Sequence, residues 1–60
     1  MNIIGNKISE SRKLKGLTQE ELADLSKVNL RTIQRIENNE NKPRGNTLNL
    51  ICNALDLDLK

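Results

Sequence analysis

The stretch from Thr18 to Glu37 constrains the fold of this chain more than any other part of the sequence. It predicts two short helices joined by a tight turn, because apolar residues recur at helical spacing on both sides of residues 26–28. Thr18 and Glu21 form the capping-box pattern T-x-x-E, in which each side chain accepts from the other residue's backbone N–H. Asn29 is a favourable N-cap for the second helix. The apolar positions of the stretch are Leu22, Ala23, Leu25, Val28, Ile33 and Ile36.

The second of these helices is expected at about Leu30–Asn38, with Ile33 and Ile36 facing a core. The residues off that stripe all carry hydrogen-bonding groups, and they are Arg31, Thr32, Gln34 and Arg35. Such a face suits the major groove of DNA, where an Arg can bond to O6 and N7 of one guanine. The three residues between the helices also match the turn length of a helix-turn-helix. These two features favour a DNA-reading surface.

The composition excludes several classes of function. The chain has no aromatic residue, no His and a single Cys, so the common zinc frameworks and an intrachain disulfide are excluded. The usual general base and the Cys–His nucleophile pair are missing as well, so we expect no enzyme, cofactor, metal site or small-molecule substrate. No apolar run approaches the roughly 20 residues of a membrane span, and the N-terminus lacks the pattern of a secretory signal. We therefore expect no membrane partner and a reducing, cytoplasmic location.

Charge is informative through its distribution. The net charge of +2 is only mildly basic. Residues 27–44, however, carry five cations against two acids: Lys27, Arg31, Arg35, Lys42 and Arg44 against Glu37 and Glu40. A cluster of this kind fits a nucleic-acid surface, but on charge alone a solvated face is the favoured interpretation, since clustering is one point among several.

The remaining segments predict two further helices and a loop. Ile4, Ile8 and Arg12 share one face of a first helix over residues 4–15, which Gly16 would end in a left-handed conformation. Because Arg12 continues an apolar stripe, we expect it to pair with Glu37, the alternative being a side chain that extends along its stem to water.

The loop at residues 38–45 holds Lys42 and Arg44, which either clamp phosphates or simply solubilise the loop. A last helix is expected at about Asn46–Leu55, and Asp58 looks like an N-cap beyond it. The buried stripe of that helix is Leu48, Ile51, Cys52 and Leu55, so Cys52 is read as a small core residue.

With these residues in place, the chain resembles the phage-repressor and Cro type of helix-turn-helix domain, also called the XRE type, from about Ile4 to Leu59. The residues that carry the similarity are 16–23, Val28, 32–37 and 54–55. The resemblance implies an all-α, compact, lambda-repressor-like bundle of four to five helices. In such domains the first helix of the motif crosses the DNA backbone and the second lies in the major groove. The chain is expected to be one domain over residues 1–60, or the N-terminal domain of a longer protein.

The resemblance also implies roles for individual residues. Base-facing positions are matched by Asn29, Leu30, Arg31 and Arg35, with Thr32 and Gln34 as neighbours that could touch base or phosphate. Backbone-contact positions are matched by Gln19, Lys42 and Arg44, and we add Thr18 beside Gln19. An end of a helix with unpaired N–H groups could hold a phosphate near Gln19, although Gln19 also reads as an ordinary exposed residue. Arg12 and Glu37 match an ion pair seen in these domains.

Three residues depart from the family pattern. Lys27 stands where the turn usually has Gly, and a left-handed lysine costs about 1–2 kcal/mol. Leu30 stands at a position that is often polar, so it either touches a thymine methyl or packs against a partner chain. Asp56 replaces a frequent Gly, and the sequence ends where a fifth, dimerising helix often begins.

Two functions follow from the sequence. The first is sequence-specific binding of double-stranded DNA as a transcriptional regulator without enzymatic activity, as a homodimer if the operator has two-fold symmetry. The alternative is a protein-binding helical module, antitoxin-like or an adaptor, that does not read DNA, and an exposed Leu30 would favour it. Salt dependence separates the two, because DNA binding weakens steeply as counterions are released.

Overall fold

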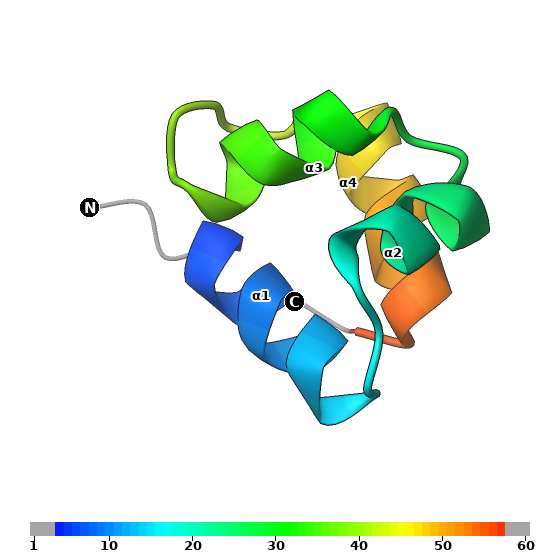
Figure 1. Ribbon diagram of the computed structural model, residues 1–60. Coiled ribbons are helices and arrows are strands. Elements are labelled where there is room, and N and C mark those ends of the chain that lie inside the picture. Colours follow the sequence, from blue (N-terminus) through cyan, green and yellow to red (C-terminus); the bar gives the residue numbers. More distant parts are fainter. Residues whose placement is uncertain (1–3, 58–60) are drawn as a thin grey trace.

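A computed structural model describes residues 4–57, and within them the chain is all-helical. The helices are α1 (Ile4–Leu14), α2 (Gln19–Ser26), α3 (Leu30–Glu37) and α4 (Gly45–Leu55). Figure 1 shows α3 along the top of the bundle and α1 at the lower left, with the start of α1 near the end of α3, and α2 in front of α4 at the right. The described residues form four helices, which agrees with the lower end of the expected four to five.

The core is entirely aliphatic and every helix contributes to it. Its fully buried side chains are Ile8 from α1, Leu22 from α2, Ile33 and Ile36 from α3, and Ile51 and Leu55 from α4. A chain of this size buries only about 60% of the surface that it exposes when unfolded. Each buried residue therefore carries a large share of the stability, and the polar contacts between helices matter correspondingly.

The ends of α2 and the start of α3 form as the capping residues predict. The Thr18 hydroxyl accepts from the Glu21 backbone N–H at 3.0 Å, and the Thr18 N–H donates to Glu21 Oε1 at 2.8 Å. The Asn29 side chain accepts from the Arg31 N–H at 2.8 Å. Between them Lys27 has φ 60° and ψ 27°, the left-handed conformation that a turn glycine would adopt without cost. The turn therefore keeps its tight geometry although it lacks glycine.

A close approach of backbones fixes how α1 meets the end of α3. Gly5 is buried, and a Cβ atom placed there would overlap the carbonyl oxygen of Ile36. Asn39, in a left-handed conformation at φ 62°, donates to the Asn6 side chain across the same contact. Only the absence of a side chain at residue 5 lets α1 lie this close to α3.

Several boundaries and exposures differ from the sequence expectations. Helix α1 ends at Leu14, one residue earlier than expected, and α3 ends at Glu37, because Asn38 is its C-cap. Gly16 has φ 71°, as its place after α1 predicts. Leu25, one of the apolar positions of the motif, lies 58% exposed on the outer side of α2. The N-cap expected at residue 58 lies outside the described residues.

Candidate nucleic-acid interface

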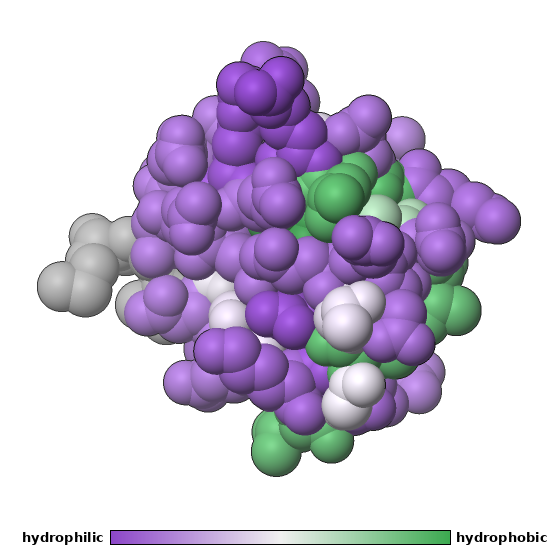
Figure 2. All heavy atoms as spheres, viewed as in Figure 1, coloured by the Kyte–Doolittle hydropathy of each residue, from purple (hydrophilic) through white to green (hydrophobic). Residues whose placement is uncertain are grey.

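Helix α3 has one buried face and one polar face. Ile33 and Ile36 are buried, and the opposite side exposes Arg31, Gln34 and Arg35 to solvent. Figure 2 shows a mainly hydrophilic surface over α3, while apolar patches gather over α2 and α4 and at the end of α1. Two cations and one amide thus project from a single helix whose other face is anchored in the core.

The first turn of α3 presents a different chemistry. Leu30 and Thr32 are half-buried, and Leu30 is not among the apolar residues packed against the core. The Oδ1 atom of Asn29 is occupied by the Arg31 N–H, which leaves the amide N–H groups of Asn29 to act as donors. The start of the helix therefore offers an amide donor, an apolar surface and a guanidinium side by side along the chain.

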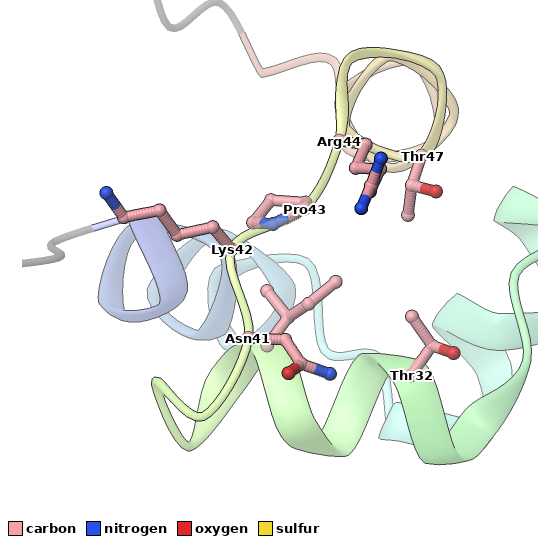
Figure 3. Close-up of a pocket in the computed structure, with 7 residues that line it drawn as sticks. Thr32, Asn41, Lys42, Pro43, Arg44 and Thr47 are labelled. Carbon is pink, nitrogen blue, oxygen red and sulfur yellow. The ribbon is translucent and has the colours of Figure 1, made fainter.

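The loop after α3 forms one wall of a groove with a volume of about 350 Å³. Thr32 and Ile36 of α3 line one side, and Pro43, Arg44 and Thr47 line the other. In Figure 3 the Arg44 side chain points into the groove beside Thr47, whereas the Lys42 side chain extends away from the groove. The two loop cations are therefore directed to different places.

Helix α4 begins at that groove. Arg44 is its N-cap residue in an extended conformation, and no side chain caps this end of the helix. The first N–H groups of α4 are thus left to solvent or to an anionic ligand beside the Arg44 guanidinium. The sequence indicated Arg44 as a phosphate contact, but it gave no signal of the groove or of the part that Thr47 plays in it.

Thr18 and Gln19 lie at the start of α2. The capping box occupies the Thr18 backbone N–H, which donates to Glu21, and the Thr18 hydroxyl oxygen, which accepts from Glu21. The hydroxyl proton of Thr18 therefore remains as a donor. The Gln19 amide donates from Nε2 to Glu37 Oε1 at 3.2 Å. Gln19 is therefore tied to the last residue of α3, a contact that no sequence pattern indicated.

Arg12 and Glu37 form the ion pair that the sequence analysis expected between α1 and α3. Arg12 Nε lies 2.8 Å from Glu37 Oε2, Arg12 Nη2 lies 2.9 Å from Oε1, and the side chains are 12% and 5% exposed. The hydrogen bond that Arg12 donates to Glu37 raises the pKa of the Arg12 guanidinium, as does the negative charge of Glu37, although burial opposes both. Arg12 Nη1 also donates to the Leu17 carbonyl at 2.8 Å, so one side chain joins α1, the α1–α2 connection and α3.

Other kinds of site find no support in the described part of the chain. No group of three His, Cys, Asp or Glu residues among residues 4–57 could hold a metal ion. None of the helices in the same range is long and apolar enough to cross a membrane. Cys52 is half-buried on α4.

These features define a small all-helical domain in which a helix-turn-helix presents its second helix to solvent. A model of the family described as Helix-turn-helix matches residues 8–60. The chain belongs to this family, and it is of the phage-repressor and Cro type, a class of DNA-binding transcriptional regulators. No curated protein and no solved structure matches the chain.

Proposed function

We propose that this protein binds double-stranded DNA sequence-specifically, as a transcriptional regulator whose helix α3 enters the major groove. The observation that carries the proposal is the two-faced character of α3, with Ile33 and Ile36 buried and Arg31 and Arg35 exposed within a helix-turn-helix. A helix held in this way can bring side chains to base edges without rearranging the core. No catalytic role is part of the proposal, because nothing in the described chain pairs an acid with a base in a cleft.

The proposed contacts fall into two groups. Base edges are read from the first two turns of α3 and its N-cap, by Asn29, Leu30, Arg31, Thr32, Gln34 and Arg35. Phosphates are held on either side of that helix, by Thr18 and Gln19 at the start of α2 and by Lys42 and Arg44 in the loop after α3. This division follows the general rule that phosphate contacts position a protein on DNA while base contacts specify the sequence.

Binding as a homodimer to a two-fold operator is part of the proposal. Two copies would place their half-sites about 34–36 Å apart, which is one turn of DNA. We also propose that residues 1–60 act as one DNA-binding domain, in the cytoplasm.

The test is selection of binding sites from a random double-stranded pool, followed by titration of the best site at several salt concentrations. We expect an enriched motif and a negative slope of log K against log salt. Arg31→Ala and Arg35→Ala should each cost about 1–3 kcal/mol on that site and relax the preference at one position. Lys42→Ala should weaken all sequences alike and reduce the salt slope by about 1. Unchanged binding in both Arg variants would show that α3 does not read bases.

A protein-binding module is a second candidate, and the exposed leucines favour it. Leu14 is 89% exposed and Leu25 is 58% exposed, whereas Leu30, which was expected to be exposed, is only half-buried, outside the core. A protein contact centred on Leu30 should be nearly insensitive to salt and should be lost in Leu30→Asp. Failure to enrich any DNA motif, together with salt-insensitive capture of a protein partner, would favour this function.

A further inference from the structure

The carboxylate of Glu37 joins three segments of the chain. It accepts from Arg12 Nε at 2.8 Å and from Arg12 Nη2 at 2.9 Å, both on α1. It also accepts from Gln19 Nε2 at 3.2 Å, at the first residue of α2. Because the Glu37 side chain is only 5% exposed, little water competes for these bonds. The end of α3 is thereby connected to the start of the preceding helix.

This contact determines how the Gln19 amide is turned. A carboxylate is an acceptor only, so it selects the NH₂ group of the amide and rejects the carbonyl oxygen. The NH₂ group has two N–H donors, and Glu37 accepts from one of them. The second N–H is left as the donor of a side chain whose rotation is already restricted. Because the Gln19 side chain is restricted before binding, less side-chain entropy is lost when a ligand binds.

The charge of Glu37 would oppose a nearby phosphate if it stood alone. Arg12 offsets it with a bidentate pair, the arrangement that gives a guanidinium its strongest bonds to a carboxylate. Arg12 is held in turn by its bond to the Leu17 carbonyl, in the residues that lead into α2. The pair is therefore neutral as a whole, and its carboxylate can orient Gln19 without repelling an anionic backbone.

We propose that Glu37 is a positioning residue for DNA binding, which orients the Gln19 amide so that its second N–H meets a DNA phosphate. This inference rests on the proposed function, because it presupposes that Gln19 contacts the DNA backbone. Glu37 itself does not touch the DNA in this arrangement. Its effect on binding passes through Gln19, and this gives a test that a purely structural role of the ion pair would not satisfy.

The test is a double-mutant cycle on the selected DNA site, with Gln19→Ala, Glu37→Gln and the two combined. Gln19→Ala should weaken binding about tenfold in the otherwise wild-type protein, as expected for loss of one hydrogen bond to a charged group. The same substitution in the Glu37→Gln protein should weaken binding less than about twofold, because an amide at residue 37 offers both a donor and an acceptor and no longer selects the NH₂ group of Gln19. Lys42→Ala is the matched control: Lys42 lies in the α3–α4 loop and forms no hydrogen bond or ion pair with Glu37 in the described chain, so its loss should be equal in both backgrounds.

A measurement on the unmodified protein covers the case in which Glu37→Gln does not fold. Side-chain ¹⁵N relaxation of the free protein should find the Gln19 amide more ordered than that of Gln34, an exposed glutamine on α3. Equal losses from Gln19→Ala in both backgrounds, no loss from Gln19→Ala at all, or equal mobility of the two amides would each overturn the positioning role while DNA binding itself stands. Absence of any DNA binding by the wild-type protein would overturn the proposed function and this inference together.

Discussion

Replacing Arg12 with Met should destabilise this domain far more than an ordinary surface charge does. The change removes three hydrogen bonds, two to the Glu37 carboxylate and one to the Leu17 carbonyl. It leaves a carboxylate that is 5% exposed with the neutral Gln19 amide as its remaining donor in the described structure. Breaking a buried pair from one side costs about 3–5 kcal/mol, and we expect about 3 because Arg12 retains some contact with water.

That loss is large on the scale of the whole molecule. A chain of 60 residues is stabilised by about 3–9 kcal/mol at about 0.05–0.15 kcal/mol per residue. Arg12→Met should therefore remove at least about a third of the stability and lower the midpoint of unfolding correspondingly. The double change Arg12→Met with Glu37→Met should restore about 2 kcal/mol of this, since an apolar pair of similar volume leaves no buried charge unpaired.

The assay is urea unfolding followed by circular dichroism at 222 nm, with the free energy taken by linear extrapolation. Lys15→Ala is the control, because the Lys15–Asp56 pair spans 3.7 Å between side chains that are 40% and 88% exposed. A pair of that kind contributes about 0–1 kcal/mol. A loss below about 1 kcal/mol in Arg12→Met, or a double variant no more stable than the single one, would refute the claim that Glu37 depends on Arg12.

Three further changes test other contacts. Gly5→Ala should cost about 3 kcal/mol of stability or prevent folding, because the added Cβ overlaps the Ile36 carbonyl oxygen and the two backbones must separate. Thermal unfolding measures the change, and a fall in Tm of less than about 2 °C would contradict the close approach. Lys27→Gly should stabilise the protein by about 1 kcal/mol, because glycine adopts a left-handed backbone conformation without cost, whereas Asn39→Gly should gain much less, because Asn tolerates that conformation. Equal gains from the two changes in urea unfolding would contradict this reasoning. Replacing thymine by uracil in the selected site should weaken binding about fivefold at one position in the wild type and have no effect in Leu30→Ala, if Leu30 contacts a thymine methyl.

The helical frame of this protein could be predicted from local sequence because its signals are local. The capping box at Thr18 and Glu21, the N-cap Asn29 and the left-handed Gly16 each depend on residues within one turn of a helix. The polar face of α3 follows from the same periodicity that buries Ile33 and Ile36. The family resemblance extends the prediction to the order of the helices, and the match over residues 8–60 confirms the family.

Exposure could not be predicted from hydrophobicity alone. Leu25 stands three residues after the buried Leu22, yet it is 58% exposed because α2 has no neighbour on that side in the described structure. Apart from the Arg12–Glu37 pair, contacts between distant segments could not be predicted either. The groove beside Thr32, and the contact of Gln19 with Glu37, depend on how α3 crosses the loop and the start of α2, which periodicity does not specify.

The position of Glu37 in the sequence nevertheless indicates a distant partner, because a carboxylate there is unfavourable for its own helix. It is the last residue of α3, where the partial negative charge of the helix end disfavours a carboxylate. A local rule broken in this way indicates that a distant contact compensates for it. Arg12 is a second anomaly, because it places a charge on the otherwise apolar stripe of α1, and its partner is Glu37. Each anomaly is resolved by the other, and because the Gln19 amide shares the same carboxylate, the pair joins the stability of the fold to the surface proposed to hold DNA.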